Sequence, residues 1–380
     1  MLTKAEKTII FIAKKKMILK QLTSFLEEFA PLSMQESYDN AGLLIGNPEQ
    51  NIESALITLD VTDEVLDEAI ANNHRLIIAH HPLIFKGLKR LTGSSLTEKL
   101  VVKAVKNDLA IYAIHTNLDN MAYGVNAKLA EKLFLTNLQI LQPGGSELKK
   151  VVVFCPEQHA EAVRDKMFEA GAGHIGNYDK CSYNTLGEGT FRAGKGANPF
   201  VGAVGKMHVE KEVKVETVVP AFKLNGVIKA MLSAHPYEEV AYDIFTLNNT
   251  TPLTGAGMIG ELTNPLPVAD YLKKIKKSLK AQAIKFNHPI DRPVKKVAFC
   301  GGSGSFLIHQ AYRAGADLFI SADIKYHDFF EHLNEMTIVD AGHYETEQFT
   351  KELLYEIITE KFTNFALQIS ETVTNPVTFL

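Results

Sequence analysis

The sequence predicts an α/β protein in which two separate halves of the chain build one domain around an inserted second domain. Strand-like and helix-like segments alternate over residues 18 to about 135 and again after about residue 257. Such alternation is typical of a mostly parallel sheet with helices on its faces. Apolar runs from both halves end in metal-compatible side chains, so we expect the two halves to fold together.

The first half contains apolar runs with the period of a helix or the length of a strand. Leu22, Phe25, Leu26 and Phe29 have helical spacing, and Thr62 is placed to cap the helix that follows it. The helices are expected at residues 18–29, 62–71, 96–107 and 126–134, and the strands at 55–60, 76–80 and 110–115.

The middle of the chain has a different order of elements. A turn-rich linker, residues 142–146, precedes it, and a second loose stretch follows at 248–252. Strands are expected at 150–154, 180–191, 212–219 and 238–246, and helices at 156–170 and 220–232. The resulting order, βαββαβ, is that of a ferredoxin-like domain.

The α/β alternation returns in the last third of the chain. The helices are expected at residues 270–279, 306–314 and 348–362, and the strands at 297–300, 317–321 and 337–340. The predicted divisions are therefore an N-terminal extension at 1–16, a first half of the α/β domain at 17–140, an insert at 148–250 and a second half at 257–380.

Two adjacent histidines, His80 and His81, end the apolar run 76–79, and Pro82 follows them. Successive strand residues face opposite sides, so one ion seldom takes both from a regular strand. A turn at Pro82 would let the two rings diverge toward two neighbouring ions. Taken alone, the pair favours a simpler explanation, one packed and one exposed histidine.

The pair is not alone, because two further strand-like runs end in similar side chains. The run 110–114 leads to His115 and Asp119, and the run 337–339 leads to His343 and Glu347. Each pair has a spacing of four residues, although Asn117 and Asp119-Asn120 are more typical of a loop. Residues four apart share one face if a helix begins at His343. The six donors converge if the three strands are neighbours. They exceed the needs of one tetrahedral ion, so we expect two divalent ions per subunit. Imidazole and carboxylate together suit zinc, iron or manganese.

Other polar residues at the strand ends have two possible roles. The loop Gly301 to Ser305 could receive an anion or could be a simple tight turn, and it lacks the third glycine of a dinucleotide fingerprint. Asp60 and Asp323 are explained by helix capping. His327 is a candidate proton carrier in catalysis, with a solvated loop histidine as the alternative.

The composition excludes several classes of protein. Apolar residues make up 46% of the chain and charged residues 22%, and the net charge is −4. These values describe a globular protein and argue against nucleic acid as a partner. Even the lysine-rich helix near residues 273–280 is expected to be a solvated surface.

Three further features of the sequence bear on the location of the protein in the cell. No segment reaches the roughly 18 apolar residues of a membrane span. The three cysteines are far apart and fit a reduced, cytoplasmic setting. Residues 1–16 have their charges after the apolar stretch, unlike a signal peptide, and we expect an extension without a structural role.

Four short runs together resemble one protein family. They are residues 38–43 (YDNAGL), 79–83 (AHHPL), 115–119 (HTNLD) and 342–347 (GHYETE). They resemble the type-2 GTP cyclohydrolase I homologue family, also called the NIF-three-like family, over residues 17 to about 140 and 257 to 375. Tyr38 departs from the tryptophan that the family often has before Asp39.

The resemblance carries expectations about the site and the assembly. It implies a two-metal site at His80, His81, His115, Asp119, His343 and Glu347. It also implies a toroidal homohexamer, and an insert similar to the CutA and PII trimeric proteins.

Three functions follow as hypotheses. The first is a metal-dependent hydrolase acting on a nucleotide or another phosphate-bearing small molecule, with GTP ring opening as the inherited expectation. Paired ions would serve a phosphoesterase equally well. The remaining hypothesis is a metal-binding regulatory or scaffold protein without catalysis.

Overall fold

A computed structural model describes residues 17–144 and 148–380. The predicted extension at 1–16 and part of the predicted linker lie outside the described residues. The chain divides into two compact units: unit 1 contains residues up to Gln142 and from Ala256 onward, and unit 2 contains Pro143–Gly255. In the described part of the chain, no helix has both the length and the apolar character needed to cross a bilayer.

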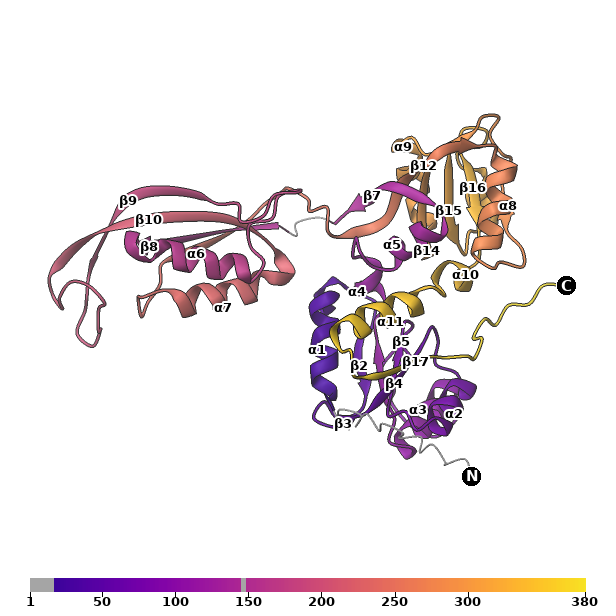
Figure 1. The fold of residues 1–380 in the computed structure, drawn as a ribbon, viewed down its shortest axis with the longest axis horizontal. Helices are drawn as coiled ribbons and strands as arrows, with labels where there is room; N and C mark the ends of the chain where they lie inside the picture. Colours follow the sequence, from indigo (N-terminus) through magenta and orange to yellow (C-terminus); the bar gives the residue numbers. More distant parts are fainter. Residues whose placement is uncertain (1–16, 145–147) are drawn as a thin grey trace, which may run out of the picture. The chain divides into compact units, whose positions relative to one another are not determined.

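The described residues of unit 1 form two large sheets rather than one, as Figure 1 shows. The five-stranded sheet contains, in spatial order, β17 (Ala366–Ile369), β4 (Ser54–Thr58), β5 (Leu76–Ala79), β6 (Ala110–Ala113) and β2 (Gly42–Ile45). Its first four strands are parallel, and β2 is antiparallel to β6. A short antiparallel pair, β1 (Met17–Ile18) and β3 (Asn51–Ile52), stands apart from it.

The helices that accompany this sheet are α1 (Leu19–Phe29), η1 (Leu32–Met34), α2 (Asp63–Ala71), α3 (Leu96–Lys106), α4 (Thr116–Asp119) and α11 (Thr350–Lys361). Of these, α1, α2, α3 and α11 follow the predicted positions closely, whereas η1 and α4 lie where no helix was predicted. The predicted helix α5 (Val125–Lys132) packs its apolar residues into the core of the six-stranded sheet. The predicted cap of α2 is confirmed, because the Thr62 hydroxyl accepts a hydrogen bond from the Val65 amide. Apolar side chains of α2 and α3 pack with β4, β5 and β6 in one buried cluster.

The six-stranded sheet is formed mainly by the second half of the chain. It contains, in spatial order, β13 (Lys285–Phe286), β16 (Thr337–Asp340), β15 (Leu318–Ala322), β14 (Val294–Ser303), β12 (Gly255–Leu266) and β7 (Leu135–Pro143). The central strands β14, β15 and β16 are parallel. The accompanying helices are α8 (Val268–Ser278), η4 (Ser305–Leu307), α9 (Ile308–Arg313), η5 (Tyr326–Phe330) and α10 (His343–Glu347).

Only two of the three donor-bearing strands are neighbours, so the donors do not converge through adjacency of all three strands. β5 and β6 are neighbours in the five-stranded sheet, whereas β16 lies in the six-stranded sheet. The long strands β7 and β12, which sequence reasoning missed, enter and leave unit 2. β17 was missed as well, and it carries the end of the chain back to the five-stranded sheet beside β4.

Unit 2 contains a four-stranded antiparallel sheet with two helices. Its elements are β8 (Leu148–Pro156), η2 (Glu157–His159), α6 (Ala160–Glu169), β9 (Tyr183–Arg192), β10 (Met207–Pro220), η3 (Ala221–Lys223), α7 (Leu224–Ala234) and β11 (Tyr242–Thr246). The spatial order of the strands is β11-β8-β10-β9. Both helices cover the same face of the sheet (Figure 1), and their apolar side chains form one core with β8 and β10.

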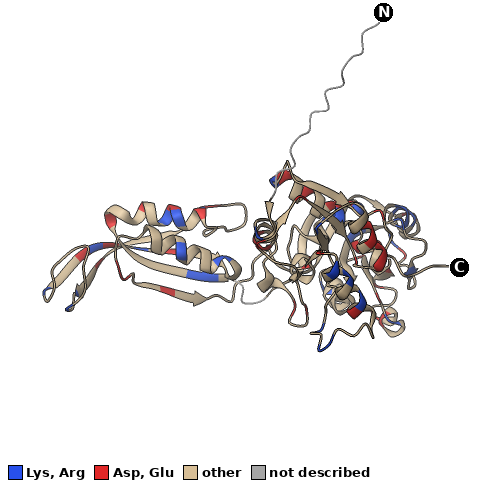
Figure 2. Ribbon diagram, turned by 90° about the horizontal axis from the view of Figure 1, so that it is seen from below, with Lys and Arg blue, Asp and Glu red and all other residues tan. Residues whose placement is uncertain are grey.

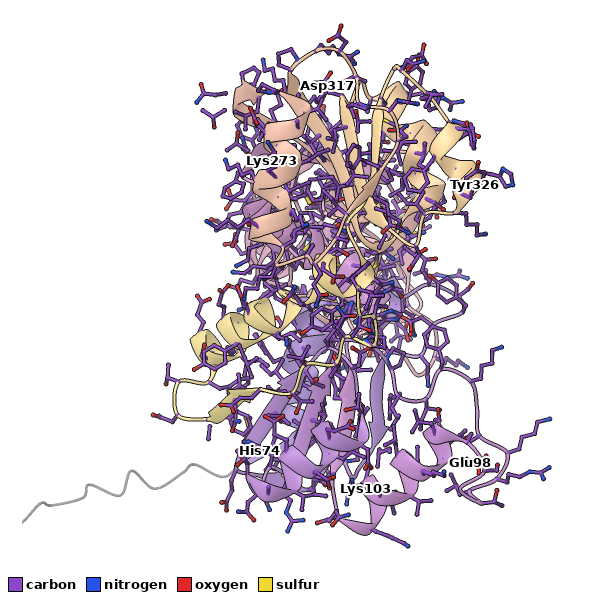
Figure 3. All side chains as sticks on the ribbon, turned by 90° about the vertical axis from the view of Figure 1, so that its right-hand side faces the viewer. His74, Glu98, Lys103, Lys273, Asp317 and Tyr326 are labelled. Carbon is purple, nitrogen blue, oxygen red and sulfur yellow. The ribbon has the colours of Figure 1, made fainter. Side chains whose placement is uncertain are left out.

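Charged residues are mixed rather than segregated on both units, as Figure 2 shows. The lysine-rich helix α8 agrees with the solvated surface expected for it. Lys273, labelled in Figure 3, is 81% exposed, while Tyr271, Leu272 and Ile275 of the same helix are buried.

Candidate metal centre

His80 and His81 lie immediately after β5, where the strand pairing continues for two more residues. The His80 amide donates to the Thr58 carbonyl at 3.3 Å, and the His81 amide donates to the Leu59 carbonyl at 2.9 Å. The backbone is therefore fixed against the end of β4. The two rings diverge, with centroids 4.9 Å apart and planes at 45°. His80 is fully buried and His81 is partly exposed.

His115 and Asp119 come from the end of the neighbouring strand β6. The expectation of a loop is wrong here, because residues Thr116–Asp119 form the short helix α4 with His115 at its N-cap position. The Asn117 side chain holds the turn, since its oxygen accepts from the His115 amide and its nitrogen donates to the Ala30 carbonyl. The His115 ring lies 5.3 Å from the rings of both His80 and His81.

The other donors come from α10, which follows β16 of the six-stranded sheet. The predicted helical spacing is confirmed: Nε2 of His343 lies 3.0 Å from Oε2 of Glu347. The same carboxylate oxygen lies 2.9 Å from Nε2 of His81. The two sheets therefore meet at this cluster. α10 contributes its donors although β16, the strand that precedes it, is not a neighbour of β5.

All six predicted ligands come together between the sheets. The described residues give three overlapping groups whose ligand atoms lie within 4.8 Å of one another: His80 with His81 and His115, His81 with His343 and Glu347, and His80 with Asp119 and Glu347. Glu347 belongs to two of these groups, and each of His80 and His81 also belongs to two. This overlap favours two adjacent ion positions over a single tetrahedral set of ligands.

Every histidine of the cluster has its outer ring nitrogen anchored. Nδ1 of His81 lies 2.7 Å from Asp60, and Nδ1 of His115 lies 2.8 Å from Asp39. Nδ1 of His343 lies 2.7 Å from Asp323, and Nδ1 of His80 lies 2.8 Å from the Ile114 carbonyl. Metal-binding histidines nearly always donate their second N–H to such acceptors, which fixes the ring and its tautomer. The four Nε2 atoms are thereby left to face the centre.

Sequence reasoning missed the three anchoring aspartates. Asp60 and Asp323 do not cap the helices that follow them, because Thr62 caps α2 and Lys325 stands at the N-cap of η5. Asp39 also accepts from the Thr116 amide and hydroxyl. The available signal was position, since Asp60 and Asp323 follow strands that end at the same site as the donors.

The hydrogen bonding of the His80 ring bears on whether these residues can bind a metal. A carbonyl oxygen can only accept, so the bond from Nδ1 to Ile114 places the proton of a neutral ring on Nδ1. Nε2 then carries a lone pair, is buried and makes no hydrogen bond to any described residue. Burial lowers the pKa of His80 to about 3, so the ring stays neutral. A metal cation would satisfy this buried lone pair, so the donor set fits a metal.

The other groups of the cluster also have strongly shifted pKa values. Burial lowers the pKa of His81, but hydrogen bonds to Asp60 and Glu347 outweigh it and raise the pKa to about 10. Bonds to Glu347 and Asp323 outweigh burial in the same way and raise the pKa of His343 to about 9. Burial and the nearby Glu347 charge hold the pKa of Asp119 well above its usual range. Protons therefore occupy positions that a cation would take.

The Gly301 to Ser305 segment makes room for the ligands. Gly302 has a φ of +61°, and a Cβ there would lie 2.1 Å from Oε1 of Glu347. The amide of Gly301 donates to the Asn126 side chain, and that of Gly302 donates to the Thr346 hydroxyl. These two donors are already used, which favours the tight turn over the anion site.

His327 is placed in η5, outside the three ligand groups. It is exposed, and its ring contacts that of Tyr326, which points away from the ribbon in Figure 3. Its role as a proton carrier stays a prediction.

Comparison with known proteins agrees with the geometry. The family model Duf34/NIF3 (NGG1p interacting factor 3) matches residues 17–376. A Bacillus subtilis protein named "GTP cyclohydrolase 1 type 2 homolog" is 38% identical over 371 residues, which cover 95% of this chain and 98% of that protein.

Solved structures are similar over the same length. A Bacillus cereus protein related to NIF3 has a TM-score of 0.84 and 40% identity, over 95% of this chain and 99% of that one. A Staphylococcus aureus protein has a TM-score of 0.74 and 29% identity, over 96% of this chain and 99% of that one. The family expected from the four sequence runs is thus confirmed, and the chain belongs to the Duf34/NIF3 family.

Proposed function

We propose that the cluster is a dinuclear metal centre and that the protein is a metal-dependent hydrolase acting on a nucleotide-like substrate. The observation that carries the metal is the buried lone pair on Nε2 of His80, which lies 3.6 Å from Asp119 and 3.9 Å from Glu347. His80, Asp119 and Glu347 would hold one ion. His81, His343 and Glu347 would hold the other.

The count of two ions rests on the overlap of the groups. Six donors exceed what one tetrahedral ion takes while keeping a position for substrate. Glu347 lies in both carboxylate-containing groups, so its two oxygens suit a shared ligand. Imidazole with carboxylate favours zinc, iron or manganese over magnesium or calcium, which prefer oxygen ligands alone.

Hydrolysis is the chemistry that such a centre supports best. Paired divalent ions supply Lewis acidity and an activated water at neutral pH. The chain's own contribution is orientation: Asp39, Asp60 and Asp323 hold three imidazoles in place, and the Ile114 carbonyl holds the fourth. The curated relative's name points to a GTP cyclohydrolase homologue, which supports a nucleotide-like substrate for this chain.

Phosphoester hydrolysis is the neighbouring candidate, because the same ligands do not choose the leaving group. The amides of Gly301 and Gly302 are committed to Asn126 and Thr346, so they offer no cradle for a phosphate. A phosphate-bearing substrate would therefore be held by the ions themselves. His327 would act as a proton carrier only if its exposed segment approaches the bound substrate.

A metal-binding regulatory or scaffold protein is the non-catalytic candidate, and unit 2 favours it. We propose that residues 148–250 form a ferredoxin-like insert similar to CutA and PII proteins, because its elements run βαββαβ and its strands lie in the order β11-β8-β10-β9. Modules of this kind often sense small molecules or assemble, which is an argument from fold analogy.

The assembly and location are also proposed from the resemblance. We expect a homohexamer, to be tested by the solution mass of the full chain. A cytoplasmic location is supported by three free cysteines, Cys155, Cys181 and Cys300.

The experiment that tests the function combines metal analysis with turnover. Purified protein loaded with zinc, iron or manganese is assayed against GTP and a panel of phosphoesters. We expect two ions per chain at the central cluster after loosely bound metal has been removed by dialysis, turnover of at least one substrate, and loss of that turnover in His81→Ala. His288→Ala is the matched control, because His288 is exposed and belongs to none of the ligand groups.

Equal inactivity of the wild type and His81→Ala, with two ions bound, would replace the hydrolase by the regulatory candidate. Absence of any bound ion at saturating metal would reject both.

A further inference from the structure

We infer that His309 and His332 form a peripheral site for one divalent transition-metal ion, separate from the central cluster. Nδ1 of His309 lies 2.9 Å from Nε2 of His332. Together with Glu331, these residues offer ligand atoms within 4.8 Å of one another. None of the three belongs to the groups that contain Glu347.

The contact between the two rings is the first argument. A hydrogen bond between imidazoles needs a lone pair on one nitrogen and a single proton between the two. A metal ion can replace that proton and receive both lone pairs. With zinc–nitrogen bonds of about 2.0–2.1 Å, a tetrahedral site places its nitrogens about 3.3 Å apart. His309 is 63% exposed and is free to shift by the few tenths of an ångström required.

The outer nitrogens supply the second argument. Nε2 of His309 lies 3.6 Å from the Glu331 carboxylate, and Nδ1 of His332 lies 3.7 Å from the Glu335 carboxylate. Each ring therefore has one nitrogen facing the other ring and one facing a carboxylate. The same arrangement holds for the anchored histidines of the central cluster, and carboxylates in this position raise the basicity of a metal-binding imidazole.

The third argument is that one of the rings is held in place. His309 and Tyr312 lie three residues apart on α9, so they share a face of the helix. The Tyr312 ring stacks on His332 at 3.8 Å with an interplanar angle of 10°, and its hydroxyl bonds to Glu335. His332 also has a φ of +49°, a left-handed conformation that residues other than glycine adopt infrequently. Strained backbone of this kind is commonly kept at ligand sites.

The ligand class follows from the donors. Two imidazoles favour zinc, nickel or copper, whereas calcium and magnesium prefer a set of oxygen ligands that two imidazoles do not provide. Two protein nitrogens at an exposed position leave coordination positions to water. We therefore expect this ion to bind more weakly than ions in the central cluster.

The test compares zinc bound per chain in the full-length protein at a series of fixed free zinc concentrations. The wild type and His288→Ala should bind one more ion than His309→Ala at saturation. Glu331→Gln should retain the ion with an affinity lower by about 10-fold, because it removes a partner of the ligand rather than a ligand. Calcium in place of zinc should show no difference among the variants.

The difference of one ion does not depend on how many ions the central cluster takes, so the outcome is separate from that of the proposed function. Thermal unfolding of His309→Ala checks that the exposed substitution leaves the fold intact. Equal zinc binding by the wild type and His309→Ala across the series would overturn the inference and leave the two rings joined by a hydrogen bond alone.

Discussion

The carboxylate of Glu347 lies 2.9 Å from Nε2 of His81, although 266 residues separate the two along the chain. One belongs to α10 after the six-stranded sheet, and the other follows β5 of the five-stranded sheet. The contact joins the two halves of unit 1 through a single ionisable group on each side. Changes to either residue should therefore be visible both in metal content and in the titration of the other.

Glu347→Gln should remove more metal than any other single carboxylate change. Glu347 belongs to two ligand groups, whereas Asp119 belongs to one. We expect Glu347→Gln to lose both ions and Asp119→Asn to lose one, as measured by elemental analysis after dialysis. Equal loss in the two variants would contradict a shared role for Glu347.

Asp60→Asn should weaken metal binding without removing a ligand. Asp60 anchors Nδ1 of His81 at 2.7 Å, and loss of such an anchor typically lowers metal affinity about 10- to 100-fold. In the metal-free protein, the pKa of His81 should fall from about 10, which NMR titration can follow. Asp63→Asn is the control, because Asp63 is an exposed partner of Lys103 on α2. Its affinity should match the wild type, and an unchanged Asp60→Asn would exclude the anchoring role.

Metal binding at neutral pH should release protons and strengthen as the pH rises. Hydrogen bonds to carboxylates outweigh burial and raise the pKa of His81 to about 10 and that of His343 to about 9, so both rings are protonated at pH 7 in the metal-free protein. A metal needs the neutral rings, and the ions must displace these protons. The apparent affinity should therefore increase from pH 7 to pH 10.

Calorimetry in buffers of different ionisation enthalpy at pH 7 measures the released protons directly. We expect about two per chain from His81 and His343, and fewer in His343→Ala. A binding enthalpy that is the same in every buffer would show that these rings do not hold protons in the metal-free state.

Gly302→Ala should disturb the cluster by a steric clash, because the substitution changes none of the candidate ligands. Gly302 has a φ of +61°, and its added Cβ would meet Oε1 of Glu347 at 2.1 Å. Gly315 is a matched control, since its φ is +74° and nothing lies within 4 Å of an added Cβ. Both variants should lose about 1–2 kcal/mol of stability from the left-handed backbone. Only Gly302→Ala should also lose metal, and retention of metal in both would show that Glu347 can move aside freely.

Local patterns were sufficient to predict most elements and to single out the six side chains that the structure brings together. Apolar runs of four or five residues located β4, β5, β6, β15 and β16, and the spacing of His343 and Glu347 predicted α10. These features depend on neighbouring residues and on the period of the chain. The donors could be recognised because imidazole and carboxylate groups follow the strands directly.

Features that depend on long-range pairing were not accessible from local patterns. The separation of β16 from β5 into different sheets depends on strand order, which no local pattern specifies. β7 and β12 do not alternate between buried and exposed residues, because most residues of β7 are exposed on both sides and four consecutive residues of β12 are buried. The anchors Asp60 and Asp323 were obscured by a second plausible role, since aspartate after a strand is also a common helix cap.

The return of β17 to pair with β4 has a consequence for biosynthesis. β4 leaves the ribosome more than 300 residues before its outer neighbour does, because β4 and β17 begin at residues 54 and 366. Until β17 has been synthesised, the nascent chain presents β4 as an unpaired edge strand, the kind of surface on which incompletely folded proteins aggregate. A chaperone that shields the emerging N-terminal segment should therefore raise the yield of native protein more than one that acts only after release.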